Sequence, residues 1–353
     1  MILWLAAIGV AFMLAALALA VHARAYTREV EAQFPPTGRF IDAEGARLHV
    51  REAAPFPGRP ASPPAISFPS PPDSQVEAPY SGEDAGDPRA AAILLIHGAS
   101  SNLLELWGPL AEEFSPLHRV IAYDRPGMGH STRMRRDAHT LKVQAKCAAR
   151  VLEQSGEGKA IVVAHSLGSA VALRLALDHP HLVSSLVLIA PAACPYPGKP
   201  AWWARLSATP LIGDIFCGLL IPWLAPPLSP ASVANNFWPA PTPVNYLREA
   251  GVPLIFRPRA FRASALDVCA TNREFAAQQP RYGDLLTPAI IITAEKDRIV
   301  SPKRHARALA SQLPAAELVI APDTGHMPHR LRTDLVVAAI RRVNEMAASS
   351  AQS

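Results

Sequence analysis

The sequence predicts an α/β fold: a mostly parallel, doubly wound sheet of about eight strands, with a helical cap inserted after the sixth strand and one transmembrane helix before the domain. Three observations predict this fold. Short apolar runs rich in β-branched residues alternate with helical stretches after residue 91, which is typical of a parallel sheet covered on both faces. A long segment separates two successive runs, and the chain begins with an apolar segment that carries no charge.

The composition indicates one large folded domain or two smaller ones. The chain has 353 residues, of which 50% are hydrophobic and 18% are charged, so wholesale disorder, collagen and coiled coil are excluded. The net charge of +5 is small for this length, and nucleic acid is therefore not an expected partner. The four cysteines lack Cys-x-x-Cys spacing, so we expect buried thiols rather than a zinc or redox site.

Residues 1–22 are predicted to be a single membrane anchor. Met1–Val21 has no charged side chain, and a helix of this length spans about 31 Å, close to the hydrocarbon thickness of a bilayer. A cleaved signal peptide is the alternative, but no Lys or Arg precedes the apolar run and the run is longer than usual for one. Arg24 and Arg28 follow the helix, which favours a cytoplasmic domain over a periplasmic or extracellular one.

The first part of the core domain is expected at residues 37–190. It opens with Gly38–Arg51, which alternates apolar and polar residues on both sides of a Glu-Gly turn and therefore predicts a hairpin. The Pro-rich residues 55–88 can neither form a helix nor bury much surface, so we interpret them as a disordered surface insertion. A Pro-rich docking site for a partner is the alternative.

The remaining elements alternate along the chain. Parallel strands are predicted at Ala92–His97, Arg119–Tyr123, Ala160–Ala164, Ser184–Ile189, Ala289–Thr293 and Glu317–Ile320, and helices at Leu141–Gln154, Leu167–Leu177, Pro302–Gln312 and Thr333–Met346. Residues 191–287 interrupt this alternation with a Trp-rich and Pro-rich segment, which predicts a helical cap or lid. The second part of the core then occupies residues 288–346.

A nucleophile is predicted where the strand Ala160–Ala164 meets the next helix. The run Ala164-His165-Ser166-Leu167-Gly168 places Ser166 on a sharp strand-to-helix turn, although Ala164 stands where Gly is usual. Small residues at 164 and 168 let the strand and helix backbones approach closely. A Ser that merely caps the helix is the alternative.

Two backbone donors are expected beside Ser166. The N–H of Leu167 lies at the start of the helix, where the free N–H groups favour negative charge. Gly98 follows a strand and permits a turn toward the same edge of the sheet, so the N–H of Ala99 could supply a second donor of an oxyanion hole. We interpret His97 as a structural residue behind this loop.

An acid and a base are predicted at the ends of the two last strands. Asp297 follows the strand Ala289–Thr293, and His326 follows Glu317–Ile320. Ser166, Asp297 and His326 would form a triad in which His326 accepts the serine proton and buried Asp297 fixes the imidazole tautomer. The alternatives are a helix-capping role for Asp297 and His329 as the base.

These residues resemble the α/β-hydrolase family, in its branch of capped, esterase-like and lipase-like serine hydrolases. The resemblance covers about residues 38–346 and includes the hairpin, His97-Gly98, Asp124–Ser131, the serine turn, Asp297 and His326. It implies that Asp124 and His130 belong to a structural turn beside the site. Capped relatives that open epoxides or remove halide carry Asp at the serine position, so that chemistry is disfavoured here.

The sequence therefore predicts a membrane-anchored serine hydrolase that cleaves carboxylic esters with hydrophobic acyl groups through an acyl-Ser166 intermediate. No metal and no organic cofactor are expected; the partners are a small-molecule or lipid ester and the membrane, and the oligomeric state stays open. The alternatives are a carbon–carbon bond hydrolase or acyltransferase with the same triad, and a catalytically idle, membrane-tethered binding protein.

Overall fold

The computed structural model describes residues 1–54 and 91–350; the predicted insertion at residues 55–88 lies outside them. An eight-stranded sheet has the order β1-β2-β4-β3-β5-β6-β7-β8. The strands are β1 (Arg39–Ala43), β2 (Ala46–Ala53), β3 (Ile93–Ile96), β4 (Val120–Tyr123), β5 (Ala160–His165), β6 (Val183–Ile189), β7 (Ala289–Ala294) and β8 (Ala316–Ala321). β2 pairs antiparallel with β1 and with β4, and all other neighbours are parallel. The predicted fold class is confirmed.

Helices cover both faces of this sheet. The core helices are α2 (Leu104–Phe114), α3 (Leu141–Ser155), α4 (Leu167–Asp178), α10 (Ala308–Ala310), α11 (Pro328–Leu331) and α12 (Thr333–Ser350). α3 and α4 pack on one face, while α2 and α12 pack on the other. Because both faces are covered, every residue of β3, β4, β5 and β7 is buried, which explains their uninterrupted apolar sequences.

One predicted helix differs from the structure, and one observed helix was not predicted. The predicted helix Pro302–Gln312 is instead a π-helical turn, Lys303–Arg307, followed by the short α10. Helix α2 was not predicted and contains Pro109. Proline removes one helical hydrogen bond, and here the burial of Leu106, Leu110 and Phe114 in the core compensates for that loss.

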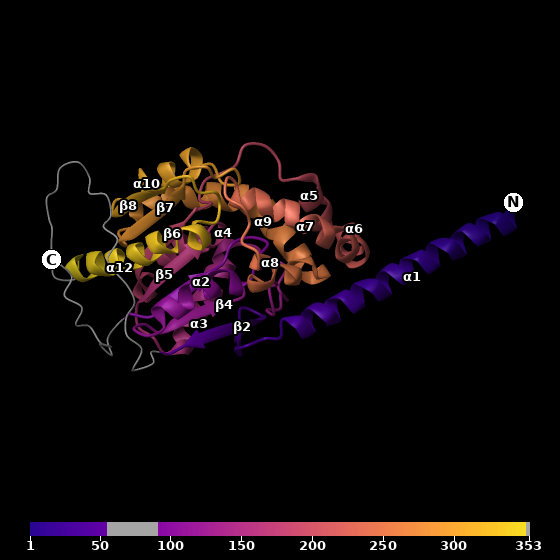
Figure 1. The fold of residues 1–353 in the computed structure, drawn as a ribbon, viewed down its shortest axis with the longest axis horizontal. Coiled ribbons are helices and arrows are strands. Elements are labelled where there is room, and N and C mark those ends of the chain that lie inside the picture. Colours follow the sequence, from indigo (N-terminus) through magenta and orange to yellow (C-terminus); the bar gives the residue numbers. More distant parts are fainter. Residues whose placement is uncertain (55–90, 351–353) are drawn as a thin grey trace.

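The segment between β6 and β7 is helical, as predicted for a cap. Its helices are α5 (Trp202–Ala208), α6 (Ile212–Ile215), α7 (Ile221–Phe237), α8 (Tyr246–Glu249) and α9 (Pro258–Gln278), with a π-helical turn at Phe216–Leu220. α7 continues through Pro226, Pro227 and Pro230. In Figure 1 these helices lie together on the side of the molecule from which the N-terminal helix extends.

Helix α1 (Ile2–Gln33) projects from the body of the protein (Figure 1). Its second half packs against the segment between β6 and β7: the Tyr26 hydroxyl donates a hydrogen bond to Pro253 O at 2.9 Å, and Glu31 pairs with Arg257 at 2.6 Å. Within the described residues, two helical segments are long and apolar enough to cross a membrane. They are Leu3–Gln33, with a mean hydropathy of 2.5, and Ile212–Phe237, with a mean hydropathy of 1.4. Signal sequences and core helices also satisfy this criterion.

Candidate active site

Ser166 lies in a strained turn between β5 and α4. Its backbone has φ 51° and ψ −121°, a combination that non-glycine residues rarely adopt and that recurs at functional sites. Its N–H donates to Ile189 O at 2.9 Å, and its carbonyl accepts from Ala192 N at 3.1 Å. These contacts to the end of the neighbouring strand β6 hold the turn and leave the side chain at the carboxyl edge of the sheet.

Gly168 allows α4 to start close to β3. A Cβ at this position would lie 2.3 Å from Ile96 O and 2.7 Å from His97 O, both backbone atoms. The requirement for a small residue at 168 therefore has a direct cause, the approach of the helix to the neighbouring strand.

Gly168→Ala is expected to lower the free energy of unfolding by about 3 kcal/mol, because the added methyl group collides with backbone that cannot move independently. Gly158→Ala is the matched control, since a Cβ there meets nothing within 4 Å. Urea denaturation of the two variants measures the difference. Equal stability of both variants would contradict this account of the turn.

The structure brings together the three residues predicted to form a triad. His326 Nε2 lies 3.1 Å from Ser166 Oγ, and His326 Nδ1 lies 2.7 Å from Asp297 Oδ2. An ionised carboxylate only accepts hydrogen bonds, so Nδ1 carries the proton and Nε2 is free to accept the serine proton. All three side chains are largely buried, with Asp297 at 1% exposure, and this burial strengthens the hydrogen bonds.

Asp297 contacts both His326 and its own loop, and it does not cap a helix, because the next helical turn begins only at Lys303. While Oδ2 contacts His326, Oδ1 accepts hydrogen bonds from the backbone N–H groups of Ile299 at 2.7 Å and Val300 at 2.9 Å. These contacts within the loop fix the carboxylate and therefore help to aim it at the imidazole.

Two backbone contacts fix the loop that carries His326. Its N–H donates to Asn236 O at 2.7 Å, near the end of α7. Its carbonyl accepts from His165 Nε2 at 2.9 Å. Burial holds the pKa of His165 well below its usual value, so this neighbouring ring is neutral. The segment between β6 and β7 thus takes part in positioning His326.

Leu167 and Ala99, the two residues expected to supply oxyanion donors, lie on either side of Ser166. Leu167 is the first residue of α4, so its N–H has no acceptor within the helix. Ala99 follows Gly98, whose hypothetical Cβ would lie 3.1 Å from Ser166 Cβ. The turn after β3 therefore lies against the serine side chain.

His329, the alternative base, has another partner. It is fully buried, and its Nε2 donates to Glu105 Oε1 at 2.9 Å. Arg330 and the Tyr246 hydroxyl donate to the same carboxylate. Burial alone would raise the pKa of Glu105, but the hydrogen bond from His329 and the nearby cations lower it to about 2. His329 therefore belongs to a buried polar cluster between α2 and α11.

The structural interpretation of Asp124 and His130 agrees with their contacts. Asp124 accepts hydrogen bonds from His49 Nδ1 and from the backbone N–H groups of Leu103 and His130, each at 2.8 Å. His130 Nε2 donates to Phe34 O at 2.7 Å. These contacts join the loops after β3 and β4 to the segment that leads into β1.

Arg125 and Asp267 form a buried ion pair that the sequence did not predict. Their side chains are 0% and 1% exposed, and Arg125 Nη1 lies 2.8 Å from Asp267 Oδ2. Arg133 pairs with the other carboxylate oxygen. Arg125 belongs to the quoted motif Asp124–Ser131, but no local pattern marks Asp267, which lies on α9, far along the chain.

Metal ligation has little support in the described part of the chain. Residues 1–54 and 91–350 contain no group of three or more His, Cys, Asp or Glu side chains arranged to hold a metal ion. The four cysteines are free, and Cys147, Cys194 and Cys217 are buried.

The sheet order and the strained serine turn define an α/β protein whose polar side chains gather at the carboxyl edge of its sheet. A family model described as alpha/beta hydrolase fold matches residues 91–332. The chain therefore belongs to the α/β-hydrolase family.

Several individual proteins are similar to this chain at low sequence identity or over part of its length. A poly(3-hydroxyalkanoate) depolymerase from Ectopseudomonas oleovorans is 38% identical over 117 residues, covering 33% of this chain and 41% of the depolymerase. The hydrolase YugF of Bacillus subtilis is 25% identical over 261 residues, covering 71% and 88% of the two chains. A solved esterase from Thermogutta terrifontis matches with a TM-score of 0.62 at 18% identity, covering 88% of this chain and 99% of that one. At this identity the likeness establishes the fold alone.

Proposed function

We propose that the protein is a membrane-anchored serine hydrolase that cleaves carboxylic esters through an acyl-enzyme. The observation that carries the proposal is the unbroken chain of hydrogen bonds from Ser166 Oγ through His326 to the buried Asp297. A serine that merely capped a helix would need neither an aligned imidazole nor a carboxylate behind it.

The reaction follows from these contacts. Ser166 Oγ attacks the ester carbonyl carbon while its proton moves to His326 Nε2, and the N–H groups of Leu167 and Ala99 stabilise the oxyanion. The tetrahedral intermediate collapses to the acyl-serine, and the alcohol leaves with the proton from His326. Water then gives a proton to His326 and attacks the acyl carbon. The bond from that carbon to Ser166 Oγ breaks, Oγ takes the proton back from His326, and the acid is released.

Two measurements test this proposal. A fluorophosphonate should label the chain at Ser166, and p-nitrophenyl esters should be hydrolysed with release of the free acid. If the protein is not labelled, the serine is not an activated nucleophile and an idle binding role is favoured. If the acyl group passes mainly to added alcohol rather than to water, the enzyme is an acyltransferase.

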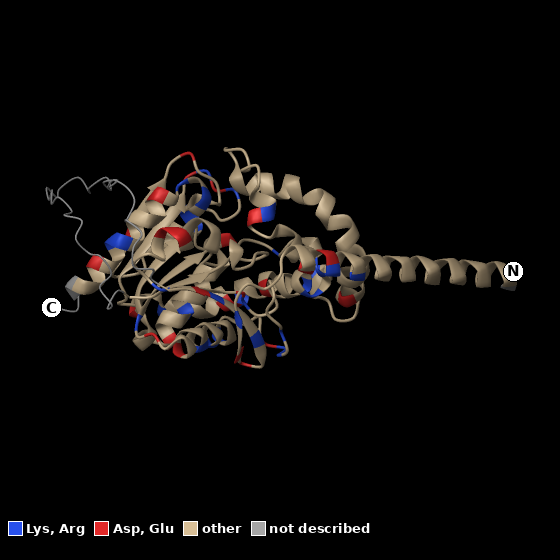
Figure 2. Ribbon diagram, turned by 60° about the horizontal axis from the view of Figure 1, so that its bottom comes forward, with Lys and Arg blue, Asp and Glu red and all other residues tan. Residues whose placement is uncertain are grey.

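The proposed membrane attachment is supported by the surface around α1. In Figure 2 the projecting half of the α1 ribbon carries none of the colours that mark Lys, Arg, Asp and Glu. The cap also exposes large apolar side chains: Trp202 at 66%, Leu211 at 77%, Ile215 at 63%, Trp223 at 57% and Leu228 at 67%. α7 contacts α1, and His22 Nε2 lies 3.4 Å from Pro222 O. An apolar surface next to a spanning helix would lie at the bilayer interface, where tryptophan is favoured.

We therefore expect the enzyme to prefer medium or long acyl chains to acetate and to be more active on lipid vesicles. Each buried CH₂ contributes about 0.8 kcal/mol, so three more methylenes should raise kcat/KM by more than about tenfold. The measurement is an ester series of increasing chain length, with and without vesicles.

Variants of the exposed apolar side chains test whether the cap surface contributes to activation by vesicles. Leu211→Gln together with Ile215→Gln should reduce the activation by vesicles, whereas Met134→Gln, which alters a side chain 77% exposed on the core domain, should not. If acetyl esters are cleaved best and vesicles change nothing, the preference for hydrophobic substrates is wrong.

A further inference from the structure

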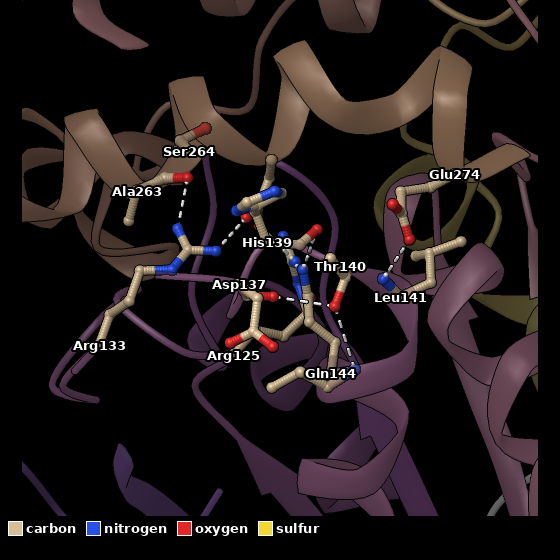
Figure 3. A network of polar contacts seen from close by, with 12 residues as sticks. Arg125, Arg133, Asp137, His139, Thr140, Leu141, Gln144, Ala263, Ser264 and Glu274 are labelled. Atoms are coloured by element: carbon tan, nitrogen blue, oxygen red, sulfur yellow. Dashed lines mark hydrogen bonds and ion pairs between the residues drawn. The ribbon is translucent and has the colours of Figure 1, made fainter. Parts of the chain in front are cut away.

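Arg125 is a fully buried cation next to the proposed oxyanion hole. It follows β4, and its guanidinium reaches the turn after β3 (Figure 3 shows Arg125 and Arg133 beside α9). Its Nε donates to His97 O at 3.0 Å and its Nη2 to Gly98 O at 2.8 Å. A buried charge is costly unless it is paired and fully hydrogen-bonded. The hydrogen-bond partners of Arg125 include the carbonyls of His97 and Gly98, both in the turn after β3.

The Gly98 carbonyl shares a peptide group with the Ala99 N–H. A trans peptide is planar, so its C=O and N–H point in opposite directions. Gly98 O accepts from Arg125 Nη2 and from His97 Nδ1, each at 2.8 Å. The contacts that hold this carbonyl therefore also fix the direction of the Ala99 N–H.

Of the two side chains that donate to Gly98 O, only Arg125 carries a positive charge. His97 Nε2 accepts the backbone N–H of Arg125 at 3.0 Å, so the His97 ring is protonated only at Nδ1. Burial, together with the charge of Arg125, lowers the pKa of His97 to about 3. A cation hydrogen-bonded to a carbonyl polarises the peptide and makes its N–H a stronger donor.

Helix α9 holds the other side of Arg125. Asp267 on α9 accepts from Arg125 and from Arg133, and Ala263 O accepts from Arg133 at 2.7 Å. Ser264 Oγ on the same helix accepts the N–H of Ser100 at 3.0 Å. The turn after β3 is thus fixed by Arg125 from one side and by α9 from the other.

We propose that Arg125 is a positioning residue that orients and polarises the Gly98–Ala99 peptide as an oxyanion donor, and that Asp267 anchors Arg125 to the cap. This inference rests on the proposed acyl-enzyme chemistry at Ser166. It assigns to the cap helix α9 an influence on the transition state that differs from covering the substrate.

Arg125→Lys tests the proposal in the full-length chain. Lysine retains the charge but cannot bind both carbonyls and the Asp267 carboxylate with one ammonium group. Losing an oxyanion donor costs about 100-fold to 1,000-fold in kcat, and a misdirected donor should cost about tenfold to 100-fold. KM should change less than about twofold, because the ground-state carbonyl depends little on the hole. The affinity for an alkyl boronic acid, which forms a tetrahedral adduct with the serine, should fall in parallel with kcat.

The control is Arg133→Gln. It removes the other partner of Asp267 but does not touch the turn after β3, so kcat and boronate affinity should stay within about twofold of the parent. The pH dependence of kcat/KM should keep its inflection in both variants, since neither contacts His326 or Asp297.

Several outcomes would overturn the inference: Arg125→Lys with parental kcat and boronate affinity, a loss confined to KM, or a moved pH inflection. If Arg125→Lys does not fold, Asp267→Asn serves instead, with at least about fivefold lower kcat at unchanged KM expected and an unchanged kcat overturning the proposal. Fluorophosphonate labelling of the parent separates the two proposals. A labelled parent with unaffected variants refutes only the role of Arg125, whereas an unlabelled parent refutes both.

Discussion

Replacing Ser166 with Ala is expected to lower ester turnover by about three orders of magnitude or more and to leave the fold intact. In the proposed mechanism the hydroxyl oxygen is the attacking atom, and no other group in the hydrogen-bond chain can take its place. His326→Ala removes the proton acceptor. Asp297→Asn lets the imidazole adopt the wrong tautomer, because an amide can donate to Nδ1. Each variant should therefore reach a similarly low rate, measured as kcat on a p-nitrophenyl ester, with circular dichroism as the test of folding.

The control for these variants is His329→Gln. Glutamine can still donate a hydrogen bond to Glu105, so the buried cluster survives while the second histidine of this loop is lost. We expect most of the activity to remain. Full activity in Asp297→Asn would show that another acid orients His326. If His329→Gln loses its activity but keeps the melting curve of the parent, His326 is not established as the base.

Acidification from pH 8 to pH 5 is expected to remove about 4 kcal/mol of folding stability through His97 and His305, and His165 acts in the same direction. Burial lowers the pKa of His97 to about 3, that of His305 to about 4, and that of His165 well below the ordinary value of 6.5. Below pH 6.5 the unfolded chain binds protons that the folded chain does not, so stability falls as pH falls. At pH 5 His97 and His305 each account for about 2 kcal/mol, and together they make up a large share of a typical stability.

His305→Asn tests this account. His305 Nδ1 accepts from the backbone N–H groups of Ala193 and Cys194, and the Asn carbonyl oxygen can replace that acceptor without titrating. The loss of stability between pH 8 and pH 5, from urea denaturation, should shrink by about 2 kcal/mol. Tyr196→Phe, which alters the ring that lies 4.5 Å from His305, should leave the size of the loss unchanged. An unaltered loss in His305→Asn would refute the assignment.

The strands and the serine turn could be predicted because their signals are local. A strand buried on both faces of a parallel sheet has to be a short apolar run, so each predicted parallel strand lies within one residue of the observed one at each end. The small residues around Ser166 reflect one tight turn against β3. The carboxyl ends of parallel strands meet at one edge of a sheet, which allowed Asp297 and His326 to be grouped with Ser166 although they lie far apart in the sequence.

The features that could not be predicted depend on contacts between side chains that lie far apart in the sequence. Asp267 on α9 is one acidic residue in a mixed helix, and only folding places it against Arg125, 142 positions away along the chain. In the sequence, His326 was preferred to His329 as the base only because it lies nearer the end of the last strand; the structure adds that Asp297 contacts His326 and that Glu105 contacts His329. α7 continues through three prolines, which local preference alone disfavours.

The sequence by itself determined which apolar runs form strands, the turn at Ser166, and the strand ends after which Asp297 and His326 lie, because backbone geometry and burial impose those residues locally. Only the tertiary structure decided which side chains are partners: Glu105 with His329, Asp267 with Arg125, and α1 with the cap. Buried polar groups must find hydrogen bonds, but any acceptor that the fold brings within reach can satisfy them, so their identity is not written in the neighbouring sequence.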